Sequence, residues 1–154
     1  SVADGTALAK DPDNTQRFDR ILLDAPCTGL GALRRRPESR WRRTPQDLAT
    51  LTQLQTRLLD AAITMLKPGG LLAYVTCSPH VAETMLQVND LRKRHPDVKL
   101  LDSASAMQRV AIQHDGESAL TRESITAGEA EANTAQLWPD LHQTDAMFFA
   151  LLTH

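Results

Sequence analysis

Residues 18–31 read FDRILLDAPCTGLG, an apolar run that ends in an acid and is followed by a turn. Three apolar residues stand in succession at 21–23, which is typical of a parallel strand that is covered on both faces. A proline and two glycines follow Asp24, and these residue types favour a turn. We therefore predict a buried parallel strand over 18–24 that leads into a turn carrying Cys27.

A second strand and turn follow after one helix. A Thr-Pro pair at 44–45 supplies an N-cap and a proline at the first helical position, and leucines recur at helical spacing between 48 and 66. The sequence KPGG at 67–70 then ends the helix. GLLAYVT, over 70–76, is predicted to be a second buried strand, and it ends at Cys77.

The rest of the chain supplies fewer elements. We predict a helix over 81–94, a short strand over 98–102 and a terminal strand over 146–152. Residues 103–136 are rich in small and polar residues without firm periodicity, so we predict a loop region with short elements. Strands that alternate with helices indicate an α/β fold, with right-handed crossovers, a mainly parallel sheet and helices on both faces.

Both cysteines are placed where such a sheet binds ligands, beyond the C-terminal ends of its strands. Cys27 follows one predicted strand and Cys77 the other, so the two thiols share one crevice if these strands are neighbours. A single cysteine is more often a small buried hydrophobic residue than a nucleophile. The turn prolines and glycines make deep packing less natural, which leaves both interpretations open.

The composition limits the class of protein. A chain of 154 residues with 42% hydrophobic and 23% charged residues is typical of one soluble domain. It contains no apolar run of the ~20 residues that a membrane helix needs, and its start does not resemble a secretory signal, so we expect a cytoplasmic protein. Its two cysteines predict free thiols rather than a disulfide framework, and no Cys/His cluster indicates a metal.

Charge is unevenly distributed along the chain. The net charge of −2 argues against a protein that coats nucleic acid through overall charge. The segment 115–131 leans acidic, whereas arginines crowd into one short stretch. This arginine stretch consists of Arg34, Arg35, Arg36, Arg40, Arg42 and Arg43.

Two motifs carry a resemblance to a known family. DAPCTGLG at 24–31, followed by the arginine stretch and Trp41, and KPGGLLAYVTCSPH at 67–80 resemble the Sun/Fmu (NOL/NOP2/Sun-type) family of RNA 5-methylcytosine methyltransferases. The family pattern is Asp-Ala-Pro-Cys-Ser-Gly in one turn and Thr-Cys-Ser in the next, and Thr28 keeps the hydroxyl. The resemblance extends from about Ala3 to the end of the chain.

The end of the chain matches this family less closely. LWP at 137–139 and DAMFFALL at 145–152 resemble the family's Leu-x-Pro and Asp-Gly-Phe-Phe ending. Ala146 and Met147 depart from that pattern, which weakens the match only locally.

The resemblance implies a Rossmann-like class I methyltransferase fold whose N-terminal strands are missing. Residues 1–154 would be the C-terminal portion of a single S-adenosylmethionine-dependent methyltransferase domain, and a first residue of Ser1 rather than Met fits a segment of a longer protein. The family's Gly-rich turn after the first strand and the acid that ends the second are absent from this sequence. We therefore expect the segment alone to be inactive and to bind cofactor weakly or not at all.

The resemblance also assigns catalytic roles. Cys77 would add to C6 of cytosine and make C5 nucleophilic enough to take the methyl group, and Cys27 would assist release of the product. Asp24 would hydrogen-bond the ring edge and stabilise the charge that develops there. Because a free thiol titrates near ~8.5, Cys77 needs a nearby cation or a helix N-terminus, and the helix that starts near Val81 is one source.

Binding roles follow from the same resemblance. Asp24 and Pro26 would lie at the cofactor, with Asp4 beside its adenine, although an Asp-Gly turn explains Asp4 equally well. The arginine stretch would hold phosphates of small-subunit ribosomal RNA while Trp41 packs beneath it or stacks. Since the target base must be unstacked, we expect single-stranded or loop RNA. Glu83 falls where the family carries an acid, but the dipole of a helix first turn explains it.

Three alternatives remain open. A DNA cytosine-5 methyltransferase uses the same chemistry with the cysteine of its Pro-Cys turn, which would make Cys27 the nucleophile. A non-catalytic RNA-binding domain would keep the sheet and the arginines but would need neither cysteine turn. An adenine-amino methyltransferase would require Asp-Ala-Pro-Cys to be a degenerate Asp-Pro-Pro-Tyr loop, and Thr-Cys-Ser would then be unexplained.

Overall fold

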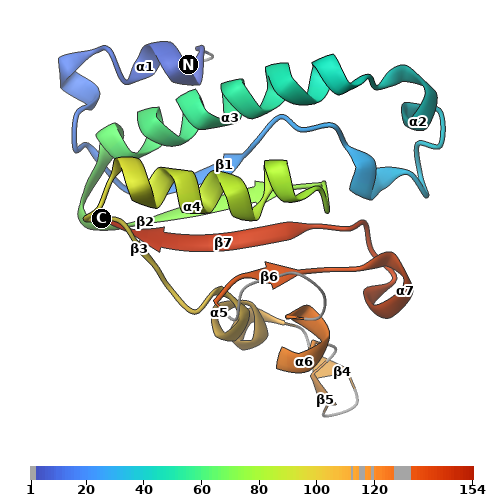
Figure 1. Ribbon diagram of the computed structural model, residues 1–154. Helices are drawn as coiled ribbons and strands as arrows, with labels where there is room; N and C mark the ends of the chain where they lie inside the picture. Colours follow the sequence, from blue (N-terminus) through green and yellow to red (C-terminus); the bar gives the residue numbers. More distant parts are fainter. Residues whose placement is uncertain (1–2, 112, 115–116, 119, 127–132) are drawn as a thin grey trace.

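A computed structural model describes the chain except residues 1–2, 112, 115–116, 119 and 127–132, together with the side chains of 112–119 (Figure 1). The main sheet contains five strands in the order β1-β2-β7-β3, with β6 paired to β7, and two further strands form a separate pair. The strands are β1 (Phe18–Asp24), β2 (Leu66–Thr76), β3 (Lys99–Leu100), β4 (Gln113–His114), β5 (Glu117–Ser118), β6 (Ala135–Gln136) and β7 (Phe148–Thr153).

The helices differ greatly in length, and α3 is the longest of those described. The α-helices are α1 (Gly5–Leu8), α2 (Ser39–Arg42), α3 (Pro45–Met65), α4 (Met85–Arg94), α5 (Ser103–Val110), α6 (Arg122–Ile125) and α7 (Pro139–His142). Three short 3₁₀ helices are η1 (Pro12–Asn14), η2 (Leu30–Ala32) and η3 (Val81–Glu83). None of the described helices combines the length and apolar character that a membrane crossing requires.

The predicted sheet is confirmed, with one strand reversed. β1 and β2 are parallel neighbours, and β7 lies between β2 and β3, antiparallel to both. β3 and β6, each antiparallel to β7, therefore run in the same direction as β1 and β2. Strand β7 starts at the edge of the sheet where β2 ends, because Phe148 pairs with Thr76, and it therefore runs in the opposite direction.

The predicted first helix forms as α3, and its start is fixed by a capping box. Thr44 Oγ1 accepts the Asp47 N–H at 3.2 Å, and the Asp47 carboxylate accepts the Thr44 N–H at 2.8 Å. The helix ends at Met65, and β2 begins directly at Leu66, four residues before the predicted strand.

The later elements agree with the prediction less closely. The helix predicted over 81–94 is interrupted at Thr84, whose φ of −124° and ψ of −100° separate η3 from α4. The prediction did not place α5, because its eight residues are too few to show a firm helical period; Asp102 caps it by accepting the Ser105 N–H at 3.0 Å. Part of the predicted loop region and of the acidic segment 115–131 lies outside the described residues.

The main core lies on one face of the sheet, beneath α3 and α4. Buried residues of both helices pack there against alternate residues of β2 and β7. On the other face, α5 and α6 pack near Phe149 of β7, so helices occupy both faces. These helices do not cover β1.

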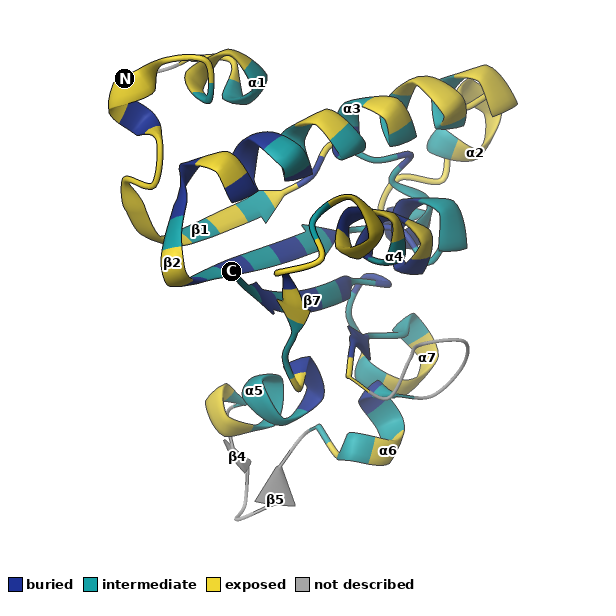
Figure 2. Ribbon diagram, turned by 60° about the vertical axis from the view of Figure 1, so that its left-hand side comes forward, coloured by how far each residue is buried: buried dark blue, intermediate teal, exposed yellow. Residues whose placement is uncertain are grey.

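The prediction that residues 18–24 are covered on both faces is therefore wrong. Leu22 is 72% exposed, and its neighbours in the same cross-strand row are Ala73 and Leu151. Figure 2 shows β1 as an exposed strand next to the alternately buried β2. The described helices bury only the face of β1 that carries Ile21 and Leu23.

Candidate active site at the two cysteine turns

The turns after β1 and β2 lie side by side because these strands are parallel neighbours. The Gly31 N–H donates to the Cys77 carbonyl at 3.0 Å, and the Gly31 carbonyl accepts the Ala146 N–H at 3.0 Å. A Cβ atom at Gly31 would lie 2.1 Å from the Ala146 carbonyl oxygen. Glycine is therefore required where the first turn passes between the second turn and the start of β7.

The two thiols share one hydrogen bond. The Sγ atoms of Cys27 and Cys77 lie 3.4 Å apart, and both residues are partly buried. The Cys27 thiol donates to the Cys77 sulfur, which lowers the pKa of Cys77 to about 7 and raises the pKa of Cys27 above its ordinary value. Burial raises the pKa of Cys27 further. Cys77 is therefore the thiol that ionises first.

This arrangement corrects the predicted source of the Cys77 thiolate. The short η3 and the break at Thr84 separate Cys77 from α4, so no regular helix begins directly after the turn. The largest effect lowering the pKa of Cys77 is the hydrogen bond from Cys27. A partner thiol, rather than a helix N-terminus, stabilises the anion.

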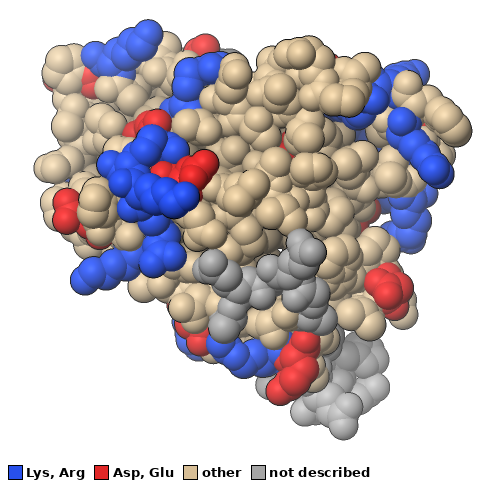
Figure 3. All heavy atoms as spheres, in the orientation of Figure 1, with Lys and Arg blue, Asp and Glu red and all other residues tan. Residues whose placement is uncertain are grey.

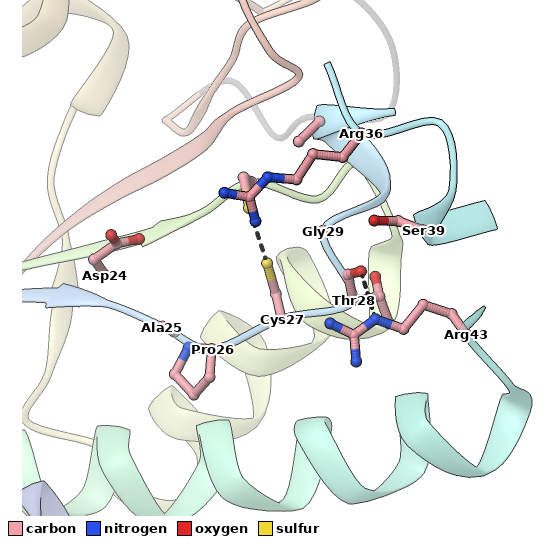
Figure 4. A pocket seen from close by; sticks show the side chains of 11 residues that line it. Asp24, Ala25, Pro26, Cys27, Thr28, Gly29, Arg36, Ser39 and Arg43 are labelled. Carbon is pink, nitrogen blue, oxygen red and sulfur yellow. Dashed lines mark hydrogen bonds between the residues drawn. The ribbon is translucent and has the colours of Figure 1, made fainter. Parts of the chain in front are cut away.

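A pocket of about 340 Å³ opens over this thiol pair (Figure 4). It brings together six of the predicted site residues, Asp24, Pro26, Cys27, Arg36, Arg43 and Cys77, with further walls from Ala25, Thr28, Gly29, Ala32 and Ser39. Figure 4 shows Arg36 reaching back over Cys27, while Arg43 lies beside Thr28. The pocket thus combines two thiols, a carboxylate and two cations.

Asp4 does not line this pocket. Its carboxylate caps α1 instead, accepting the Thr6 N–H at 2.8 Å and the Thr6 hydroxyl at 2.7 Å. These bonds lower the pKa of Asp4. The turn interpretation therefore accounts for the contacts that Asp4 makes here.

The arginine stretch divides into two kinds of residue. Arg43 Nε donates to the Thr28 carbonyl at 3.0 Å, and Arg35 forms a two-pronged ion pair with Asp145 at the start of β7. In the described part of the chain, the side chains of Arg34, Arg36 and Arg42 form no hydrogen bond or ion pair. Figure 3 shows basic side chains gathered over the end of the molecule that carries α2.

Trp41 lies beneath the guanidinium of Arg40 and is otherwise exposed. Its side chain is 83% exposed, and the Arg40 guanidinium lies 5.6 Å from the ring centroid. Arg40 thus lies over one face of the ring, and the high exposure leaves the rest of the ring open to a stacking partner.

Three residues that support the site were not identified as such from the sequence. Glu83 lies in the first turn of η3, as expected, but it is also fully buried and accepts hydrogen bonds from Thr28 and Gln55, which the helix dipole does not explain. Gln55 is also fully buried, and Asp145 holds Arg35. The sequence signals for these roles were an acid and an amide among apolar helix residues. They did not identify the contacts, because the bonded residues lie 28 to 110 positions apart in the chain.

Within the described ranges, no group of three or more His, Cys, Asp or Glu side chains is arranged to hold a metal ion.

The chain is similar in sequence to known proteins. Rv1407 of Mycobacterium tuberculosis, named as a methyltransferase, is 50% identical over 149 residues, which cover 97% of this chain and 28% of that protein. Ribosomal RNA small subunit methyltransferase B of Erwinia tasmaniensis is 43% identical over 116 residues, covering 73% of this chain and 27% of that protein. The chain thus spans less than a third of these relatives.

Solved structures and the family profile agree with these relatives. NSun6 from Pyrococcus horikoshii, solved with SFG, superimposes with a TM-score of 0.74 at 27% identity, over 99% of this chain and 33% of that one. This match confirms the Rossmann-like methyltransferase fold and fits a partial domain. The profile described as 16S rRNA methyltransferase RsmB/F matches residues 1–153. The chain therefore belongs to the RsmB/F family of 16S rRNA methyltransferases.

Proposed function

We propose that this chain carries the catalytic thiols of an S-adenosylmethionine-dependent enzyme that methylates C5 of a cytosine in small-subunit ribosomal RNA. The observation that carries the proposal is the 3.4 Å contact between Cys27 and Cys77 at the ends of two adjacent parallel strands. Family membership supports ribosomal RNA as the substrate. The activity is proposed for a longer cytoplasmic protein, in which residues 1–154 form the C-terminal portion of the catalytic domain.

Cys77 acts as the nucleophile. Its thiolate forms a bond to C6 of the cytosine, and the electron pair displaced from the C5–C6 double bond makes C5 electron-rich. C5 would then form the new carbon–carbon bond to the methyl group that S-adenosylmethionine supplies, and the methyl–sulfur bond would break with its electron pair remaining on the cofactor sulfur. Loss of the C5 proton to a base restores the double bond as the Cys77–C6 bond breaks, and its electron pair returns to sulfur.

Cys27 assists the last of these steps. The hydrogen bond that it donates stabilises the Cys77 thiolate in the free enzyme. The same bond stabilises that thiolate as the leaving group when the adduct resolves, because the charge then reappears on the same sulfur. A raised pKa suits this role, since Cys27 must stay protonated to donate.

The pocket residues fit a cationic cofactor on one side. Asp24 is an exposed carboxylate at the end of β1, and with Pro26 it lines the pocket next to the thiols. S-adenosylmethionine supplies the methyl group as an electrophilic sulfonium, and Asp24 and Pro26 would hold it there. Asp24 also faces the incoming base and can accept hydrogen bonds from its ring edge. Asp4 stays a weaker proposal, because its carboxylate is engaged at α1.

The RNA approaches over the arginine stretch. Arg36 and Arg43 line the pocket, and Arg34, Arg40 and Arg42 extend the basic surface beyond it. Guanidinium groups bind phosphate without reading the base, so this surface would position the strand. The target cytosine must leave its stack to reach Cys77, which favours single-stranded or loop RNA.

Covalent trapping tests the proposal. The longer enzyme, with Cys77→Ala or Cys27→Ala, is incubated with cofactor and RNA containing 5-fluorocytosine, whose C5 fluorine cannot be removed as a proton. We expect a covalent complex in the wild type and in Cys27→Ala, and none in Cys77→Ala. A complex that persists in Cys77→Ala and disappears in Cys27→Ala would assign the nucleophile of the DNA enzymes; absence of any complex would support a binding domain.

A further inference from the structure

We propose that Glu83 is a positioning residue that holds the Cys27 turn against the Cys77 turn and so sets the hydrogen bond between the two thiols. Its importance for catalysis rests on the proposed function, but its effect on the thiols does not.

The fully buried Glu83 carboxylate receives donors from two other segments. Its Oε1 accepts the Thr28 N–H at 2.8 Å and Gln55 Nε2 at 3.2 Å, and its Oε2 accepts the Thr28 hydroxyl at 2.5 Å. Its backbone carbonyl accepts the Tyr74 hydroxyl at 2.7 Å. A buried carboxylate is costly unless it is hydrogen-bonded, and these donors satisfy it. The carboxylate therefore links α3, the loop after β2 and the Cys27 turn.

Cys27 is held on both sides by this network. Gln55 Nε2 also donates to the carbonyl of Pro26 at 2.9 Å, directly before Cys27, and Thr28, directly after it, binds Glu83. The direction of the Cys27 side chain thus depends on side chains from α3 and η3. The hydroxyl of Thr28 also approaches Ser78 Oγ at 3.5 Å, next to Cys77.

The sheet itself cannot supply this alignment. The last ladder contact beyond the end of β1 is the Ala25 N–H to the Val75 carbonyl at 2.9 Å, and the next backbone bond between the turns is that of Gly31 to Cys77. In the described residues, no backbone-to-backbone hydrogen bond joins positions 26–30 to the Cys77 turn. Glu83 fills this gap in the backbone pairing.

The test uses the longer enzyme, in which peptide mapping follows Cys27 and Cys77 separately. The rate of Cys77 alkylation by iodoacetamide is measured against pH by peptide mass spectrometry. The wild-type midpoint is expected at about 7. We expect the midpoint to rise towards the ordinary ~8.5 in Glu83→Ala, and to rise by less in Thr28→Val, because the Cys27 thiol is no longer aimed at Cys77.

Two conservative variants separate positioning from charge. In Glu83→Gln, the amide oxygen can accept from Thr28 N–H and Gln55, and the amide nitrogen can donate to the Thr28 hydroxyl. We expect the Cys77 midpoint to stay near the wild-type value in Glu83→Gln and in Thr28→Ser. Leu152→Ala, which creates a cavity in the core away from the turns, serves as the control for lost stability and should also leave the midpoint in place.

Several outcomes would overturn the proposal. A Cys77 midpoint that stays at the wild-type value in folded Glu83→Ala and Thr28→Val would do so, and if Glu83→Ala does not fold, Thr28→Val alone decides. An equal rise in Glu83→Gln would mean that charge, not position, matters, and an equal rise in Leu152→Ala would mean a general loss of structure. Because alkylation needs neither RNA nor cofactor, it can fail or succeed independently of the proposed methyltransfer.

Discussion

Cys27 and Cys77 lie 50 positions apart in the chain, yet their sulfur atoms lie 3.4 Å apart and form a hydrogen bond. A thiol surrounded by apolar atoms would be hard to ionise, because burial penalises the charged form. The neighbouring S–H bond offsets that penalty at Cys77 and increases it at Cys27. Of two chemically identical residues, Cys77 thereby becomes the hydrogen-bond acceptor and Cys27 the donor. These are the properties that the proposed nucleophile and the proposed donor to its leaving thiolate require.

Replacing Cys27 tests this division of roles. We predict that Cys27→Ala raises the pKa of Cys77 from about 7 towards ~8.5, because the donor is lost. The pH profile of Cys77 alkylation measures this value. Cys27→Ser is the matched control, since its hydroxyl still donates, and should give a value between the two. An unchanged Cys77 profile in Cys27→Ala would show that the anion has another source.

Among the elements, the segment from η2 to Arg43 has a structural role and a proposed role in RNA binding. Arg35 and Arg43 are used inside the molecule, where they fasten the segment to Asp145 and to the Cys27 turn. Arg36 and Arg42 are exposed, and in the proposed function they bind RNA phosphates. Charge alone could not separate these groups in the sequence, because each internal partner lies far along the chain or on the backbone.

The ion pair between Arg35 and Asp145 predicts a pH dependence of stability. The Arg35 guanidinium lowers the pKa of Asp145, so the pair stabilises the fold above the ordinary value near ~3.9 and is lost as pH falls through the lowered value. Arg35→Met should lower the urea midpoint at pH 7, and the difference should disappear in acid. In an Asp145→Asn background the same substitution should have a smaller effect without pH dependence; an equal effect would exclude the pair as its cause.

The exposed arginines predict a salt-dependent RNA affinity. Arg36→Gln with Arg42→Gln should reduce the slope of log affinity against log salt by about 1.4 for single-stranded RNA, which is ~0.7 per lost phosphate contact. Fluorescence anisotropy over a salt series measures the slope. Arg92→Gln with Lys93→Gln removes the same charge from the end of α4 and should leave the slope unchanged. Equal losses in both pairs would indicate binding through overall charge.

For the whole molecule, the sequence predicted the main strands, α3 and the two cysteine turns, because each is encoded in a local pattern. The apolar runs ILL and GLLAYV indicate strands, and the Thr-Pro pair indicates the start of a helix, without any knowledge of the fold. The exposure of Leu22 could not be predicted, since it depends on which helices cover which face. The contact between Glu83 and Thr28 could not be predicted either, because the two residues lie 55 positions apart.

The sheet also explains why the site lies where it does. Parallel strands β1 and β2 end at the same edge, so residues that follow them meet there, and β7 brings Asp145 to the same edge from the opposite direction. The row of exposed Leu22 and partly buried Ala73 and Leu151 leaves the adjoining face of the sheet incompletely covered. A site assembled from three strand ends in this way requires the fold, although its two central residues follow from short motifs.

Peptide mapping of the trapped RNA complex tests the central claim most directly. Trypsin separates the two cysteines, because Arg34 lies between them and Arg57 precedes the Cys77 peptide. After digestion of the wild-type complex with 5-fluorocytosine RNA, mass spectrometry identifies the peptide that carries the nucleotide. The proposed mechanism predicts the nucleotide on the peptide that contains Cys77. A nucleotide found on the Cys27 peptide would contradict it.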